Sequence, residues 1–149
     1  VLKKLFLIAV LLGAVVIGCS KGGSNDNLNW EENLETALQK AKAENKAVLV
    51  NFTGSDWCQW CIKLSDEVFS KSEFEDYAED NLILVRLDFP RSIEQSTETK
   101  TYNNQLAQRY GVQGFPTVLL FNSQGQMVLQ TGYLPGGPAT YVDHLKNKL

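Results

Sequence analysis

Residues 47–64 read AVLVNFTGSDWCQWCIKL and place two cysteines, Cys58 and Cys61, between two different kinds of element. Residues 47–52 form a near-continuous apolar run, which is typical of a strand buried on both faces of a sheet. After the first cysteine, apolar residues recur at helical spacing: Trp60, Leu64 and Val68. The sequence therefore predicts a buried strand, a short loop and a helix that carries the cysteine pair.

Hydrophobic periodicity and turn residues predict the other elements. We expect helices at residues 30–44, 72–81 and 102–110 and a last one from residue 137, and strands at residues 82–88, 117–121 and 127–131. Capping boxes at residues 29–32 and 72–75 mark two helix starts. Helices between strands favour parallel pairing, and the turn at residues 122–125 favours an antiparallel hairpin. The expected fold class is α/β, with one mixed sheet and helices on both faces.

The composition fits one globular domain. The chain has 149 residues, of which 44% are hydrophobic and 21% charged, and this length is enough for a single core. Its net charge is −3. A nucleic-acid-binding domain normally carries a basic stripe, so we expect no nucleic-acid partner.

The first residues resemble the signal peptide of a bacterial lipoprotein. Lys3 and Lys4 precede an uncharged run at residues 5–18, whose helix of about 21 Å is too short for a hydrocarbon core of about 30 Å. The run ends in VIGC (residues 16–19), which is similar to a lipobox, where the signal is cut before a lipidated cysteine. We expect a signal peptide at residues 1–18, a lipidated Cys19 and flexible tether at residues 19–29, and one domain at residues 30–149.

Three interpretations of the cysteine pair are open. A structural zinc site needs four ligands, but Cys19 is the only other cysteine and His144 the only histidine. A structural disulfide closing so short a loop gains little stability. A redox pair fits best, because backbone N–H groups and the helix dipole at a helix start favour thiolate, and the spacing lets Cys61 bond to Cys58. Such a pair needs neither a metal nor an organic cofactor.

Three motifs resemble the thioredoxin superfamily. Residues 48–63 look like its strand, Trp-Cys-x-x-Cys and helix, YGVQGFPT (residues 110–117) is similar to its cis-proline loop, and Gly132 matches a third motif. The resemblance covers about residues 30–149 and implies a thioredoxin-like fold. The start of the domain and the SDWCxWC form of the motif are similar to those of envelope thioredoxin-like proteins and of the C-terminal domain of the bacterial disulfide-reducing membrane hub.

The resemblance also implies roles for individual residues. Cys58 would be the exposed nucleophile and Cys61 the buried resolving cysteine of a redox-active Cys58–Cys61 disulfide. Trp57 would shield the pair, and Pro116 would follow a cis bond. The residues expected to bind substrate are Trp57, Gln59, Trp60, Phe115 and Pro116.

The sequence departs from the superfamily pattern in four places, one of which is a loop at residues 53–56 that is one residue longer. Asn51 stands where the superfamily usually has a buried Asp, the proton acceptor for the resolving cysteine. Residues 89–101 look like an insertion, and the first strand of the pattern is not evident in residues 20–29. His144 is expected on the surface, far from the cysteines.

The expected function is that of a lipid-anchored thiol–disulfide oxidoreductase of the bacterial cell envelope, facing the periplasm or in the outer membrane. Gln59 and Trp60 bring no cation between the cysteines, which favours a reductase or isomerase over an oxidase. The expected partners are client proteins with disulfides or thiols and a membrane-embedded electron donor. The alternative from another class is a non-catalytic thioredoxin-like binding lipoprotein.

Overall fold

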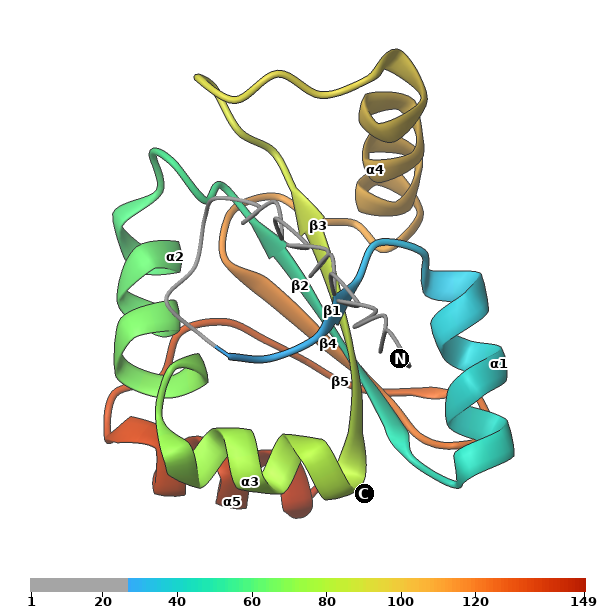
Figure 1. Ribbon diagram of the computed structural model, residues 1–149, viewed down its shortest axis with the longest axis vertical. Helices are drawn as coiled ribbons and strands as arrows, with labels where there is room; N and C mark the ends of the chain where they lie inside the picture. Colours follow the sequence, from blue (N-terminus) through green and yellow to red (C-terminus); the bar gives the residue numbers. More distant parts are fainter. Residues whose placement is uncertain (1–26) are drawn as a thin grey trace, which may run out of the picture.

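A computed structural model of the protein describes residues 27–149, so the expected signal peptide, Cys19 and most of the expected tether lie outside the described residues. The elements, in chain order, are β1 (Trp30–Glu31), α1 (Leu34–Glu44), β2 (Ala47–Thr53), α2 (Gln59–Leu64), the π-helix η1 (Ser65–Phe69), α3 (Ser72–Asn81), β3 (Leu82–Asp88), α4 (Thr97–Arg109), β4 (Thr117–Phe121), β5 (Met127–Thr131) and α5 (Gly137–Lys146) (Figure 1). Between residues 27 and 149, no helix is both long enough and apolar enough to cross a bilayer.

The strands form one mixed sheet in the order β1-β3-β2-β4-β5. β1, β3 and β2 run parallel, while β4 is antiparallel to both β2 and β5. All seven residues of β2 pair with β3, and five of them also pair with β4. The expected mixed sheet, with a parallel β-α-β unit and an antiparallel hairpin, is confirmed.

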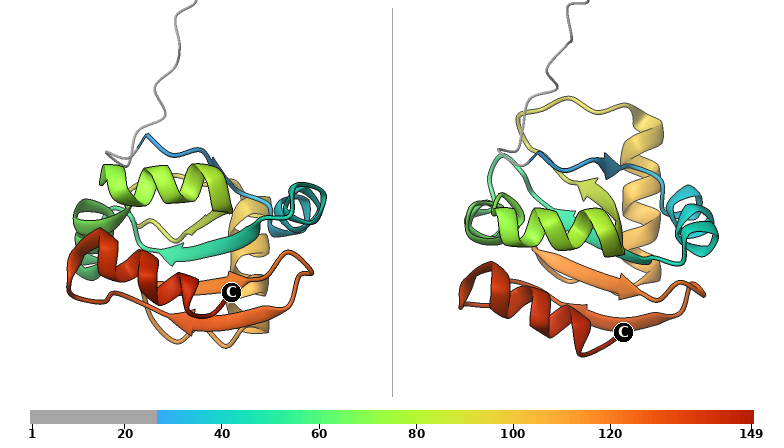
Figure 2. Two further views of the ribbon diagram at one scale, coloured as in Figure 1. Left: turned by 90° about the horizontal axis from the view of Figure 1, so that it is seen from below. Right: turned by 60° about the horizontal axis from the view of Figure 1, so that its bottom comes forward.

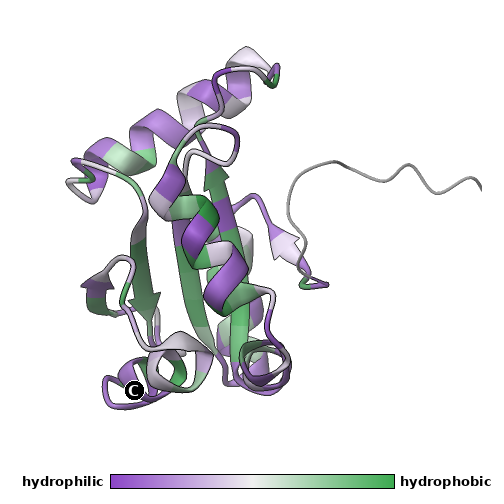
Figure 3. Cartoon of the chain, turned by 90° about the vertical axis from the view of Figure 1, so that its left-hand side faces the viewer, coloured by the Kyte–Doolittle hydropathy of each residue, from purple (hydrophilic) through white to green (hydrophobic). Residues whose placement is uncertain are grey.

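Helices cover both faces of this sheet (Figures 1 and 2). Successive residues of β2 point to opposite faces, so Leu49 packs with the side chains of α2, η1, α3 and α5, while Val48 and Val50 pack with those of α1 and α4. Figure 3 shows the apolar strands between helices whose colouring is mostly polar. The domain therefore has one hydrophobic core on each face of the sheet, and β2 contributes side chains to both.

Phe69 joins several elements in one of the two cores. η1 follows α2 without a break and buries both Val68 and Phe69. The Phe69 ring lies 5.4 Å from that of Trp30, 4.9 Å from Phe74 and 6.1 Å from Tyr141. It thus connects β1, α3 and α5 to the helix that carries the cysteines.

The predicted start of the first helix was wrong. α1 begins at Leu34, where the Asn33 side chain accepts the N–H of Thr36 at 2.8 Å. Trp30 and Glu31 instead form β1, the first strand that was not evident from the sequence. Pairing with β3 and packing of Trp30 on Phe69 outweigh the local capping pattern at residues 29–32.

Three further local predictions need correction. α4 begins at Thr97 rather than at residue 102, because Ser96 caps it by accepting the N–H of Thr99 at 3.1 Å. α3 starts at Ser72 as expected, but without the predicted capping box: its N-cap, Lys71, makes no side-chain cap bond. Trp60 does not share the buried stripe of the active-site helix, since it is 56% exposed.

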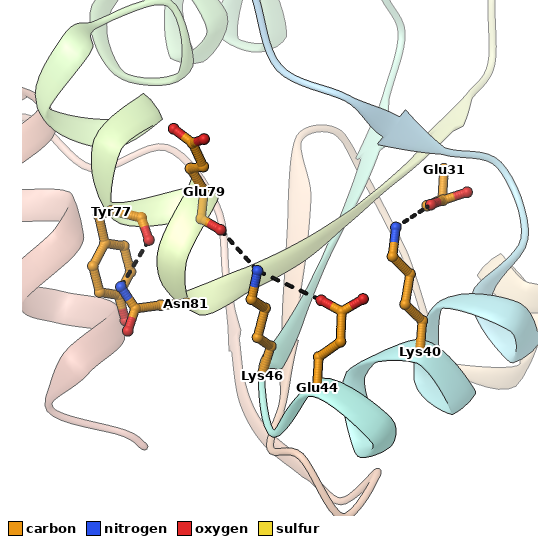
Figure 4. A network of polar contacts seen from close by, with 7 residues as sticks. All are labelled: Glu31, Lys40, Glu44, Lys46, Tyr77, Glu79 and Asn81. Carbon is orange, nitrogen blue, oxygen red and sulfur yellow. Dashed lines mark hydrogen bonds and ion pairs between the residues drawn. The ribbon is translucent and has the colours of Figure 1, made fainter.

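Charged side chains tie α1, β1 and α3 together at the start of β2 (Figure 4). Lys46 donates to the carbonyl oxygen of Glu79 at 2.8 Å and pairs with Glu44 at 3.5 Å, and Lys40 pairs with Glu31 at 3.2 Å. The cysteines follow the other end of β2. This network therefore belongs to the scaffold and not to the candidate site.

Replacement of Phe69 tests its connecting role. Phe69→Ala should lower the free energy of unfolding by about 3–5 kcal/mol, because it leaves a cavity where four aromatic side chains meet. Met127→Ala, at a position that is 48% exposed, should change it by less than about 0.5 kcal/mol. Urea unfolding of both variants measures the difference, and a similar small loss for both would contradict the role of Phe69.

Candidate active site

The cysteine pair lies where β2 gives way to α2. Cys58 is the N-cap of α2, and its Sγ accepts the backbone N–H of Cys61 at 3.2 Å. The two residues form a disulfide with their Cα atoms 5.2 Å apart. A sulfur at this position faces the backbone N–H groups and the positive end of the helix dipole. Both the N–H groups and the dipole favour the thiolate after reduction. The sequence placed this pair correctly.

Exposure does not distinguish the two cysteines. Cys58 is 6% exposed and Cys61 5%, so the expectation of an exposed Cys58 is wrong for the disulfide form. Two interactions hold the Cys58 sulfur against the first turn of α2: the disulfide bond to Cys61, and the hydrogen bond that it accepts from the backbone N–H of Cys61. Any difference in reactivity must therefore come from position along the helix and from changes on reduction.

Trp57 is held in place from several sides. Its indole N–H donates to the carbonyl oxygen of Phe89 at 2.8 Å, and its ring lies edge-on to Phe115 with centroids 6.0 Å apart. Gly54 leaves room for the indole, since a Cβ there would come within 2.5 Å of it. Phe89 follows β3, so the apparent insertion after β3 contributes directly to the site.

Residues 89–93, which we call the latch segment, are fastened to the loop before Cys58. The Asp56 carboxylate accepts the N–H of Arg91 at 2.9 Å and the N–H of Ser92 at 2.6 Å, and these bonds lower the pKa of Asp56. The N–H of Phe89 donates to the carbonyl oxygen of Thr53 at 2.8 Å. The latch segment thus has a defined position against the loop that leads to Cys58.

The cis-proline loop lies against the same aromatic group. The Phe115–Pro116 bond is cis, as the resemblance implied. Phe115 stacks on Phe89 with centroids 4.8 Å apart, and both Phe115 and Pro116 are half-buried. A Cβ on Gly132 would lie 2.9 Å from the Pro116 carbonyl oxygen, which explains why this position requires glycine.

A second group of side chains surrounds Trp60, and it was missed by the sequence reasoning. The Trp60 and Tyr133 rings are 5.2 Å apart, and Lys63 Nζ lies 5.2 Å from each ring centroid. Glu67 accepts the Tyr133 hydroxyl at 2.6 Å, which raises the pKa of Tyr133, and pairs with Lys63 at 3.7 Å. The spacing of Trp60, Lys63 and Glu67 along one helix could have indicated this contact. Gln59, the other residue between the cysteines, is exposed.

Two buried side-chain polar atoms have no hydrogen-bond partner within residues 27–149. Asn51 is 6% exposed in the middle of β2, and its Oδ1 makes no hydrogen bond. The other atom is Nε2 of His144, whose ring lies 6.4 Å from that of Tyr141. His144 is half-buried, so its expected surface position is only partly correct. In the same part of the chain, His, Cys, Asp and Glu side chains form no group of three or more that could hold a metal ion.

Comparison with known proteins identifies the family. The model of a family described as a thioredoxin-like domain matches residues 34–146. The disulfide bond reductase DsbH of Chlamydia pneumoniae is 40% identical over 123 residues, which cover 83% of this chain and 74% of that protein. The chain belongs to the thioredoxin-like family.

Other members of the thioredoxin-like family support the assignment. A solved structure of a DsbH oxidoreductase matches with a TM-score of 0.77 and 35% sequence identity, covering 92% of this chain and 94% of that one. The thiol:disulfide interchange protein DsbD of Vibrio cholerae is 30% identical over 115 residues, which are 75% of this chain but 17% of that longer protein. The thioredoxin-like domain is thus homologous to DsbH and to a short part of DsbD.

Asn51 generates a prediction about the resolving step. In a thiol–disulfide exchange Cys61 must lose its proton before it attacks Cys58, and burial raises the pKa of a thiol. An amide has no basic form at physiological pH, whereas a carboxylate can accept this proton. Asn51→Asp should therefore speed release of a preformed Cys58 mixed disulfide by about tenfold or more, while lowering stability by about 1–3 kcal/mol.

Stopped-flow tryptophan fluorescence can follow this release, because Trp57 and Trp60 flank Cys58. Asn51→Ala is the matched control, since it removes the amide without adding a base. Release at the wild-type rate in a folded Asn51→Asp protein would show that proton acceptance at this position does not limit the step.

Proposed function

We propose that this protein is a thiol–disulfide oxidoreductase of the bacterial cell envelope that reduces or isomerises protein disulfides. The observation that carries the proposal is the Cys58–Cys61 disulfide at the N-cap of α2. Two features support it: the cis Phe115–Pro116 bond, and homology to a protein named as a disulfide bond reductase.

The only reacting groups that the protein supplies are the sulfurs of Cys58 and Cys61. In the reduced protein, the Cys58 thiolate attacks one sulfur of a client disulfide, so that a Cys58–client bond forms and the other client sulfur leaves as a thiolate and takes up a proton. Cys61, once deprotonated, attacks the Cys58 sulfur and releases the second client thiolate. Two electrons pass from the dithiol to the client, and the protein is left with the Cys58–Cys61 disulfide.

Trp57, Gln59, Trp60, Phe115 and Pro116 are proposed to bind the client. Trp57 and Phe115 are neighbours beside the cis-proline bond, where an extended client segment would lie along the backbone of Phe115. Gln59 and Trp60 follow Cys58 in the sequence and are exposed. The proposed client-binding residues therefore come from both the active-site motif and the cis-proline loop.

The name of the relative DsbH supports reduction as the direction of transfer. Oxidation is the alternative direction, and a binding module with an inert disulfide is the alternative from another class. A membrane-embedded electron donor and a lipid on Cys19 complete the proposal, with periplasm-facing or outer-membrane placement. The lipobox-like residues 16–19 support this placement.

Cysteine variants test the reaction. The wild-type protein should catalyse reduction of insulin by dithiothreitol, and Cys58→Ser should lose this activity almost completely, because no nucleophile remains. Cys61→Ser should keep the attack but not the resolution, so it should accumulate a client mixed disulfide that is visible by mass spectrometry. A wild-type protein without turnover, and with Cys58 slow to alkylate after mild reduction, would favour the binding module.

The anchor can be tested separately. Metabolic labelling with a fatty-acid analogue should mark the wild-type protein, and Cys19→Ala should abolish the label because it removes the acceptor thiol. Cys58→Ala is the control and should keep the label. Label that persists in Cys19→Ala would contradict lipidation at this position.

A further inference from the structure

Each tryptophan next to Cys58 or between the cysteines has a cation over its ring. The Arg91 guanidinium lies 3.8 Å from the Trp57 ring centroid, and Lys63 Nζ lies 5.2 Å from that of Trp60. Arg91 comes from the latch segment and Lys63 from α2, so the two cations approach the active site from different elements. Neither cation lies between the cysteines in the sequence.

The two cations differ in their charge partners. Lys63 pairs with Glu67 at 3.7 Å, so a carboxylate of the same helix already offsets its charge. Arg91 is exposed, and its guanidinium makes no ion pair with any residue from 27 to 149. Of the two cations, Arg91 is therefore the one whose charge is available to a charge on another molecule.

The position of Arg91 is restrained through its backbone. The Asp56 carboxylate accepts the N–H groups of Arg91 and Ser92, and the Phe89 carbonyl holds the Trp57 indole. The stack on Trp57 restricts the guanidinium further. A side chain restrained in this way loses less conformational entropy when it binds a partner.

Two large apolar side chains of the same region are also exposed, beside the polar Gln59. Trp60 is 56% exposed and Ile93, in the latch segment, is 49% exposed. Lys42 and other surface cations of residues 27–149 also make no ion pair, so what distinguishes Arg91 is its stack on the ring of Trp57, next to Cys58. Opposite charges across an interface favour the correct partner and its orientation.

We propose that the protein prefers client disulfides whose attacked cysteine has a carboxylate side chain beside it, and that Arg91 recognises this carboxylate. The inference rests on the proposed function and adds the chemistry of the client segment to it. A planar guanidinium suits a carboxylate because it can donate two parallel hydrogen bonds. Asp56 acts in this scheme as a positioning residue for the latch segment.

Three disulfide-bonded peptides test the preference. They differ only in the residue beside the cysteine, which is Glu, Gln or Lys, and the rate of each with the reduced protein is divided by its rate with dithiothreitol to correct for intrinsic reactivity. The Glu peptide should react about two- to fivefold faster than the Gln peptide, as expected for one exposed ion pair, and the Lys peptide more slowly. The difference in corrected rate between the Glu and Lys peptides should become smaller in about 0.5 M salt, because salt screens the interaction between exposed charges.

Variants assign the effect to Arg91. Arg91→Ala should remove the difference among the peptides, Arg91→Glu should reverse it, and Arg91→Lys should keep part of it. Asp56→Ala should reduce the difference although the cation remains. Lys42→Ala is the matched control, because this exposed cation lies in the last turn of α1 before the start of β2, and it should leave the preference unchanged.

Two outcomes separate this inference from the proposed function. If the reduced wild-type protein reacts with all three peptides at equal corrected rates, the acidic-client inference is wrong and the oxidoreductase proposal stands. If none of the peptides reacts, the proposed function itself fails. A preference that survives in Arg91→Ala would assign recognition to another group and overturn the role of Arg91.

Discussion

Pairing along both edges of β2 is the constraint on which the rest of the structure depends. β3 pairs with every residue of this strand, and β4 with most of them, so the end of β2 has little freedom. The loop that carries Trp57 and the N-cap position of Cys58 start from that end. Because the cis-proline loop leads directly into β4, the same sheet also places Pro116 relative to the cysteines.

Elements with strong local signals could be predicted from the sequence. The buried strands β2 and β3, the hairpin of β4 and β5 and the proline-started α5 lie where the apolar runs and turn residues indicated. β1 could not be predicted, because two residues carry no periodicity and their conformation depends on pairing with β3. The start of α4 was missed because a polar helix beginning at Thr97 shows little apolar pattern, and Ser96 was its only local signal.

In the candidate site, too, some residues could be predicted from local sequence and others could not. Cys58, Cys61 and Pro116 belong to contiguous motifs and were found, whereas Arg91, Phe89 and Tyr133 reach the site from distant segments. A polar stretch such as residues 89–96 looks like a solvated loop until the Asp56 carboxylate is seen to bind its backbone N–H groups. Contacts between a side chain and distant backbone leave no periodic trace in a sequence, so only the structure could show that this segment packs against the loop before Cys58.

The shortness of β1 has a consequence for the behaviour of the molecule in a crowded compartment. β1 pairs with only Leu84 and Val85, so no strand of residues 27–149 lies beside the outer edge of β3 at Leu82 and Ile83. An uncovered edge strand can recruit a strand of another chain and start aggregation. Here that edge borders a hollow of about 530 Å³ whose lining includes charged side chains, namely Glu31, Lys40, Glu44, Lys46, Glu75, Asp76 and Glu79. A second chain would have to strip water from these charges before it could pair, and this cost protects an edge that the fold itself leaves open.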